Sequence, residues 1–272
     1  MFKTVFAADI GSKCIKCVAR GQVAAEETAI ALEAGAKLTV AAAGNAALLH
    51  RSGVIRPVRD GAAANTRMLA LLLGRLACEK TGKRTTASIE LHAAIPHMLP
   101  TVKQNALKQA ARLAGFRALQ VHDPLLMGAI GADADLFSDR AHMIVNIGAE
   151  TMTCAAFANG AELRAAAQRG QTALIRFVKD AVKALQPEAA ADLLDTGITL
   201  IGGGALQFGL AECFSRELPE IQILTAKNAV TAVADGMNAV IFKKESRVTA
   251  FKKLFTEIGA ARPSATAAEA SV

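Results

Sequence analysis

Three consecutive glycines are the most chemically suggestive stretch of the sequence. Gly202, Gly203 and Gly204 follow the apolar, β-branched run at residues 198–201 and precede a helix-like stretch. A single glycine would mark only a turn, whereas three leave main-chain N–H groups free of side chains, so that a flat or anionic ligand can lie against them. A tight strand-to-helix turn without a ligand explains the same residues equally well. The stretch alone leaves both interpretations open.

A second glycine-containing motif occurs twice. The residues ADIGSK at 8–13 and NIGAET at 146–151 each place an Ile-Gly pair between two strand-like segments. A hairpin repeated in this way predicts two related domains with a ligand between them.

Strands and helices alternate around these motifs, which predicts an α/β fold. Helix signals include Thr101 as an N-cap, Gly115 past the end of that helix, and Pro124 near the start of the next. The predicted strands are 5–10, 15–19, 29–32, 37–43, 88–95, 119–121, 143–147, 151–157, 198–201 and 222–224, and the predicted helices are 65–78, 101–114, 124–132, 173–185 and 206–217.

The composition narrows the class of function. The chain has 272 residues, of which 52% are hydrophobic and none is Trp or Tyr. Its net charge of +7 is scattered apart from a basic cluster at residues 243–253, without an RNA-binding aromatic signature or zinc-finger spacing, so we expect no nucleic-acid partner. No apolar run reaches the roughly 18 residues of a membrane span, and no signal-peptide pattern opens the chain. We therefore expect an intracellular protein.

The cysteines indicate a reducing compartment and no metal site. There are five, an odd number, without a small disulfide-rich frame. Cys14 and Cys17 form a CxxC motif, but they lie on an extended segment, where an odd separation points side chains to opposite faces. We interpret them as two unrelated small buried side chains.

Several longer stretches resemble the MreB family of bacterial actins within the actin-like ATPase superfamily. GNAALLHRSGVIRPVRDGAAAN at 44–65 resembles the family's stretch with a "RPLxDG" turn. AAIPHMLPTVKQNALKQAARLAGF at 93–116 and VHDPLLMGAIGA at 121–132 are similar to its "PxxxTxxERxAxxxAxxxAG…EEPMAAAIGA". ADLLDTGITLIGGGALQFGLAE at 191–212 resembles its adenosine motif. The resemblance extends from about residue 5 to about residue 255.

The resemblance implies an actin-like, ribonuclease H-like two-domain fold with ATP or ADP in the interdomain cleft. Asp9 corresponds to the acid that holds Mg²⁺ through water, and Asp123 takes the place of the glutamate that orients the attacking water; these two are the implied catalytic residues. Lys16 matches the spacing of the phosphate-binding lysine of eukaryotic actin. The implied nucleotide-binding residues are Gly11, Ser12, Lys13 and Lys16 on the first hairpin, Asn146, Gly148, Glu150 and Thr151 on the second, and Gly202, Gly203, Gly204 and Ala205 against the adenosine and α-phosphate.

The second hairpin departs from the family pattern in ways that predict slow or absent hydrolysis. Where the family has "DIGGGTT", this chain has "NIGAETM". Asn146 carries an amide, which supplies no charge for a metal and does not act as a base. Glu150 replaces a glycine near the expected γ-phosphate, and Lys13 occupies a position that is usually small and neutral. Lys13 and Glu150 either pair across the cleft or both point to solvent.

The expected domain organisation follows the family, with one deletion. We expect domain I at 1–139 with subdomain IB inserted at about 24–62, domain II at 140–235 with subdomain IIA only, a C-terminal helix at 236–258 that returns to domain I, and a disordered tail at 259–272. Too few residues separate Gln171 from Ile198 to form subdomain IIB. In the family this subdomain covers the adenine and supplies part of the filament contact.

The segment at residues 247–258 has an amphipathic helical pattern with basic residues opposite its apolar side. It either lies on an anionic membrane or packs back onto domain I.

These features predict a cytoplasmic, self-assembling cytoskeletal or scaffold protein related to cell shape, with peripheral association to the inner membrane as an open alternative. Copies of the same chain are the expected partner, and ATP or ADP is expected to act as a structural ligand more than as fuel. A monomeric nucleotide-dependent adaptor, similar to the EutJ-type chaperone-like ATPases, is the main alternative. A true ATPase in which Asp9 and Asp123 suffice is a further one.

Overall fold

The computed structural model describes residues 4–32, 38–39, 53–171 and 173–242. Two five-stranded sheets dominate it. The first contains β1 (Thr4–Ile10), β2 (Cys14–Ala19), β3 (Gln22–Glu27), β9 (Ile89–Ala94) and β10 (Ala118–His122). The second contains β11 (His142–Ile147), β12 (Thr151–Ala158), β13 (Ala161–Arg169), β14 (Ile198–Ile201) and β15 (Ile223–Thr225).

The two sheets share one topology. Their strand orders are β10-β9-β1-β2-β3 and β13-β12-β11-β14-β15. In each sheet three strands run antiparallel as a meander, and two later strands add in parallel beside the first strand of the meander. The repeated hairpin motif of the sequence is therefore the first turn of the same meander in each half.

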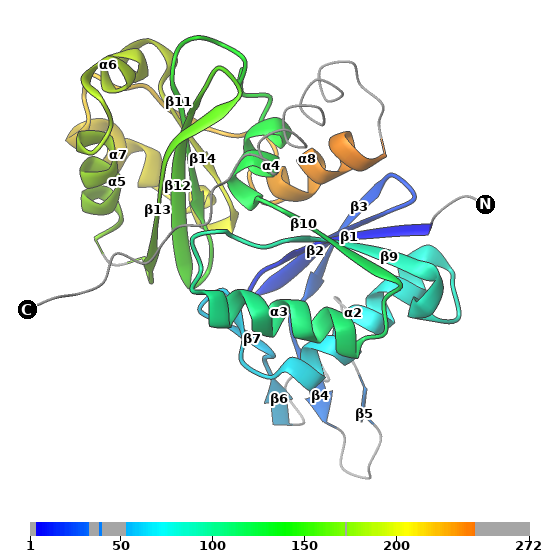
Figure 1. Ribbon diagram of the computed structural model, residues 1–272. Helices are drawn as coiled ribbons and strands as arrows, with labels where there is room; N and C mark the ends of the chain where they lie inside the picture. The colour runs from blue at the N-terminus through cyan, green and yellow to red at the C-terminus, as the bar shows by residue number, and fades with distance from the viewer. Residues whose placement is uncertain (1–3, 33–37, 40–52, 172, 243–272) are drawn as a thin grey trace, which may run out of the picture.

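Helices form three layers around these sheets (Figure 1). The outer face of the first sheet packs against α2 (Thr66–Thr81) and α3 (Thr101–Leu113). The outer face of the second packs against α5 (Leu174–Lys183), α6 (Pro187–Thr196) and α7 (Leu210–Glu217). Between the sheets lie α4 (Pro124–Gly131) and α8 (Ala232–Ile241), in one core with residues of both sheets.

Glycines let α4 and α8 approach each other at backbone distance. A Cβ at Gly131 would lie 1.8 Å from the carbonyl oxygen of Ala232, and a Cβ at Gly236 would lie 1.8 Å from that of Met127. No side chain fits at either position without a shift of the backbone. This helix pair therefore sets the spacing of the two halves.

Smaller elements extend from the first half. The strands β4 (Ile30–Leu32), β5 (Leu38–Thr39) and β6 (Gly53–Ile55) form a three-stranded sheet. A tight hairpin joins β7 (Val58–Arg59) to β8 (Ala62–Ala63) through Asp60 and Gly61, both with positive φ. Two short 3-10 helices, η1 (Thr86–Ser88) and η2 (Gly203–Leu206), complete the described elements.

The structure corrects the sequence-based elements in a few places. Thr101 is the first residue of α3 and not its N-cap, because Pro100 holds the cap position without a side-chain hydrogen bond. α7 begins at Leu210 and not at residue 206, because the glycine-rich segment winds into η2 first. The sequence analysis missed β3 and β13, whose alternation is blurred by alanine and charged residues.

Between β13 and β14, the described chain forms α5 and α6, and the expected absence of subdomain IIB stays a prediction. The expected helix at 236–258 is described only as far as the end of α8 and Phe242; the amphipathic segment at 247–258 and the tail at 259–272 lie outside the described residues. Within the described ranges, no helix is both long and apolar enough to cross a bilayer.

Candidate functional site

A cleft of about 390 Å³ opens between the two halves, where the β1–β2 turn, the β11–β12 turn and the loop after β14 meet. Its volume lies in the range of roughly 300–1,000 Å³ typical of small-molecule sites. Most of the sequence-predicted site residues line it: Asp9, Gly11, Ser12, Lys13, Lys16, Asn146, Gly148, Thr151, Gly202, Gly203 and Gly204. Asp123, Glu150 and Ala205 are not among the lining residues.

The first hairpin brings a carboxylate and an ammonium together. Asp9 and Lys16 are cross-strand partners on β1 and β2, and Nζ of Lys16 lies 3.2 Å from Oδ2 of Asp9. The Asp9 carboxylate raises the pKa of Lys16, which keeps this largely buried ammonium protonated. At the tip, a Cβ at Gly11 would lie 2.6 Å from the carbonyl oxygen of Cys14, so the turn itself requires glycine.

The second hairpin has the same kind of tip but different side chains. The N–H of Gly148 donates a hydrogen bond to the carbonyl oxygen of Thr151 at 2.9 Å. A Cβ on Gly148 would lie 2.9 Å from the same oxygen. The Glu150 carboxylate accepts a hydrogen bond from the N–H of Asp60 at 2.7 Å. Asp60 in turn pairs with Arg169 at 3.6 Å.

Of the two alternatives for Lys13 and Glu150, cross-cleft pairing is therefore wrong for this structure. Both residues lie in the described part of the chain, where no ion pair joins them, and Lys13 is exposed. Glu150 instead ties the second hairpin to the β7–β8 turn of the first half.

The triple glycine serves two purposes. Gly202 has φ +87°, and a Cβ there would lie 2.5 Å from both Oδ1 of Asn146 and the carbonyl oxygen of Ile147. A Cβ at Gly204 would lie 2.3 Å from Cγ2 of Ile147. The fold itself thus requires these two glycines. A Cβ at Gly203 would meet nothing within 4 Å, and the residue lines the cleft, so no contact within the described fold requires a glycine there.

Two glutamines that the sequence analysis did not single out connect the glycine loops. Nε2 of Gln171 donates to the carbonyl of Gly148 at 2.7 Å, and Nε2 of Gln207 donates to Oε1 of Gln171 at 2.6 Å. Both line the cleft. Their sequence signal is weak, because neither glutamine belongs to a motif that would single it out.

Asp123 lies at the start of α4, with its carboxylate already engaged. Oδ1 accepts hydrogen bonds from the N–H groups of Leu125 and Leu126 at 2.9 and 3.1 Å, which caps the helix. Oδ2 lies 2.7 Å from Nδ1 of His97. The expected role of Asp123 in orienting water stays a prediction, and it would require this carboxylate to exchange a partner.

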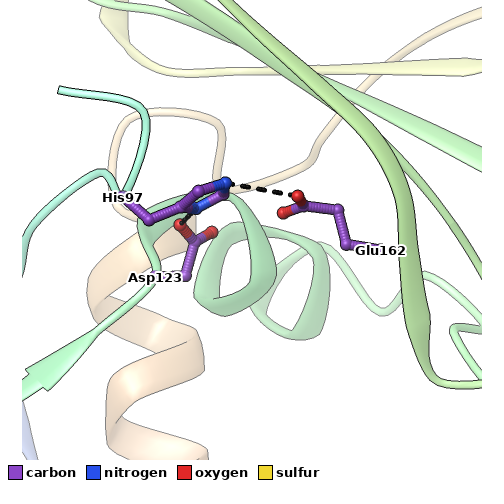
Figure 2. A group of neighbouring side chains, drawn as sticks. All are labelled: His97, Asp123 and Glu162. Carbon is purple, nitrogen blue, oxygen red and sulfur yellow. Dashed lines mark hydrogen bonds and ion pairs between the residues drawn. The ribbon is translucent and has the colours of Figure 1, made fainter. Parts of the chain in front are cut away.

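His97 is held between two carboxylates from opposite halves (Figure 2). Its Nε2 lies 3.2 Å from Oε1 of Glu162 on β13. Hydrogen bonds raise the pKa of His97 to about 10, the larger contribution coming from Asp123 and the smaller from Glu162. Burial of the imidazole lowers the pKa but does not outweigh them.

One ligand atom from each of these three residues lies within 4.8 Å of the others, close enough to hold a metal ion. A protonated imidazole, however, has no lone pair to offer a metal. The arrangement is that of an ion triad across the two halves.

The expectation of two buried cysteines is right for Cys17 and wrong for Cys14, which is only partly buried. Cys14 lines the cleft, whereas Cys17 is buried in the core under α2 and α3, and both are free thiols. Burial raises the pKa of Cys17 to about 11, which disfavours the thiolate needed for redox or metal chemistry.

Comparisons with a family profile and with a curated relative point to the same protein family. The profile of the family described as MreB/Mbl protein matches residues 3–161 and 158–249. The cell shape-determining protein Mbl of Bacillus subtilis (strain 168) is 21% identical over 261 residues, covering 69% of this chain and 78% of the relative.

Two solved structures share the fold. MreB5 of Spiroplasma citri bound to ADP has a TM-score of 0.76 at 16% identity, covering 93% of this chain and 98% of the other. The MamK double helical filament has a TM-score of 0.67 at 14% identity, covering 85% and 96%. The expected actin-like fold is thereby confirmed.

Proposed function

The chain belongs to the MreB/Mbl protein family, and we propose that it is a cytoskeletal or scaffold protein that assembles into filaments with an adenine nucleotide bound in its cleft. Hydrolysis of that nucleotide is slow or absent. The observation that carries the proposal is the meeting of two glycine hairpins and a glycine loop around one cleft, with Gly203 open toward it.

The cleft suits a nucleotide in shape and polarity. Main-chain N–H groups at the two hairpin tips are suited to phosphate oxygens, and Lys13 adds positive charge on the same side, beside the Asp9–Lys16 ion pair. The open backbone at Gly203 leaves room for a flat base or ribose. MreB5 of Spiroplasma citri, with the same fold, was solved bound to ADP.

The case for weak hydrolysis rests on three residues. Asn146 supplies an amide where the family pattern has an acid. The Glu150 carboxylate is bound to the Asp60 turn, and the Asp123 carboxylate is bound to His97 and to the start of α4. None of the three is a carboxylate positioned to accept a proton from water beside a phosphate.

Self-assembly is supported by the family and by the fold of the MamK filament. Actin-like filaments stack one subunit on the next through a heterologous contact that does not close. With only α5 and α6 between β13 and β14 in the described chain, that contact falls to the second sheet's helices and to the first half.

Sedimentation and negative-stain microscopy of the purified full chain, without nucleotide and with ADP or ATP, test this function. We expect filaments above a critical concentration in at least one of these conditions. A chain that stays monomeric in all of them, and also in the presence of anionic vesicles, would favour the monomeric adaptor. Phosphate release at a steady rate, abolished by Asp123→Ala, would instead favour the true ATPase.

A further inference from the structure

The charges that face the cleft do not match a magnesium nucleotide. Among the described lining residues, Asp9 is the only carboxylate, and Lys13 and Lys16 are the cations. Mg²⁺ in nucleotide sites is held by one or two carboxylates, directly or through water, together with the phosphates. The implied Mg²⁺ therefore depends on Asp9 alone.

Asp9 is already neutralised. Its Oδ2 lies 3.2 Å from Nζ of Lys16, with both side chains only about one sixth exposed (16% and 15%). This ion pair offsets the negative charge that Asp9 would otherwise offer to a metal. A hydrated Mg²⁺ next to Asp9 would also lie next to this buried ammonium, and the two cations would repel each other.

The other positions that would face a metal offer no charge. Asn146 presents an amide, and its Oδ1 packs against Gly202. Asp123 is paired with His97 outside the lining of the cleft, and Glu150 is bonded to the N–H of Asp60. The residues present do not fit a divalent cation.

The Lys13 ammonium offers the positive charge that a metal ion would otherwise supply to the phosphates. It lies at the first hairpin tip, lines the cleft and is exposed, and it has no ion-pair partner in the described part of the chain. Its backbone is fixed, because its carbonyl accepts a hydrogen bond from the N–H of Thr28 at 2.9 Å. A long, hydrated ammonium on a fixed hairpin is suited to a phosphate group as a point charge.

We propose that this chain binds the free nucleoside polyphosphate without Mg²⁺, with the Lys13 ammonium as the counter-charge to the terminal phosphate. The inference rests on the proposed nucleotide binding and names the form of the ligand. It also explains why a lysine replaces a small residue at the same time as an asparagine replaces an acid on the facing hairpin.

Isothermal titration calorimetry with ADP, on full-length protein freed of metal, tests the inference in Mg²⁺ and in EDTA. We expect the dissociation constant in EDTA to stay within about threefold of that in Mg²⁺. Lys13→Ala should weaken binding in EDTA by about 10- to 100-fold, the value of one charge-assisted contact, and Lys13→Arg should retain most of it. Lys183→Ala, at the exposed end of α5, is the matched control and should bind as the wild type.

Three results would overturn the inference, and each overturns a different part of it. Binding that disappears in EDTA and returns with Mg²⁺ would overturn metal independence but leave nucleotide binding intact. No binding of ADP in either condition would overturn the proposed nucleotide ligand together with the inference. Unchanged binding by Lys13→Ala in EDTA would remove Lys13 from the site.

Discussion

At the scale of single residues, the three glycines after β14 separate a structural requirement from a functional one. Gly202 combines a backbone conformation that only glycine adopts readily with contacts too close for a Cβ, whereas Gly203 has neither. Identical residues side by side in the sequence therefore have different reasons to be there. The sequence left ligand and turn equally open; the structure supplies the turn requirement at Gly202, and the ligand interpretation of Gly203 stays a prediction.

Substitution of these glycines gives opposite results. Gly202→Ala should lower the free energy of unfolding by about 2–4 kcal/mol, because the Cβ is both strained and crowded. Gly203→Ala should leave stability within about 0.5 kcal/mol of the wild type but weaken ADP binding by at least about tenfold. Urea unfolding and calorimetric titration measure the two effects. Equal loss of stability in both variants would contradict this assignment.

The His97 triad predicts a specific pH dependence. The folded-state pKa of about 10 exceeds the ordinary value of 6.5, so the triad stabilises the protein fully below pH 6.5, and this contribution is lost as the pH rises to about 10. Because the His97 side chain is 32% exposed, we expect a difference of roughly 1–2 kcal/mol between wild type and His97→Gln at the acid end of this range. The difference should shrink steadily with pH in urea unfolding. A difference independent of pH would contradict the triad.

At the scale of elements, the close packing of α4 against α8 is the feature that the sequence does not predict. The repeated hairpins and the strand order around them follow from alternating apolar residues and glycine tips. The close crossing of α4 and α8 does not follow, because Gly131 and Gly236 belong to segments distant in sequence and each looks like an ordinary small residue in an alanine-rich helix.

Two glycine-to-alanine changes in helices test this crossing. Gly236→Ala in α8 should destabilise the protein by about 2–4 kcal/mol, because its Cβ would overlap the Met127 carbonyl. Gly74→Ala in α2 is the control: its Cβ would lie at an ordinary 3.6 Å from Thr86, and the better helix propensity should stabilise the protein by about 0.5–1 kcal/mol. Thermal unfolding distinguishes the two signs. A stabilising Gly236→Ala would show that the helices can separate at little cost.

The sequence predicts which backbone turns form the candidate site, but it does not predict how the side chains around them pair. Glycine tips and the residues on them converge on the cleft because hairpin position is encoded locally. The partners of Asp123 and Glu150 were not predictable, since His97, Glu162 and Asp60 reach them from other elements. Side-chain pairing across two halves depends on tertiary geometry that one sequence does not display.

At the scale of the whole molecule, three polar contacts join the halves on the β12–β13 side of the cleft, and one of them is the largely exposed Arg169–Asp60 ion pair. The other two ties are less exposed. Glu150 accepts the N–H of the Asp60 turn, and Glu162 meets the His97–Asp123 pair. In an actin-like fold, a ligand in the cleft can also set the relative orientation of the halves. A ligand shifts the equilibrium between two orientations of the halves only by its difference in affinity for them. If contacts within the protein already hold the orientation that assembles, nucleotide binding changes the population of that orientation little.

We therefore expect the wild type to assemble to a similar extent with and without ADP. In the double variant Glu150→Ala and Glu162→Ala, we expect assembly to depend on ADP. Removing these two ties leaves only the exposed Arg169–Asp60 pair on this side, so the halves sample other orientations and the bound nucleotide then restores the competent one. Right-angle light scattering and sedimentation without and with ADP measure the effect. Asp195→Ala, which removes the exposed partner of Arg140 on the second half, is the control and should assemble as the wild type. If the double variant assembles equally well without nucleotide, these two ties do not set the orientation, and the remaining contacts between the halves, chiefly the α4–α8 crossing, hold them in register.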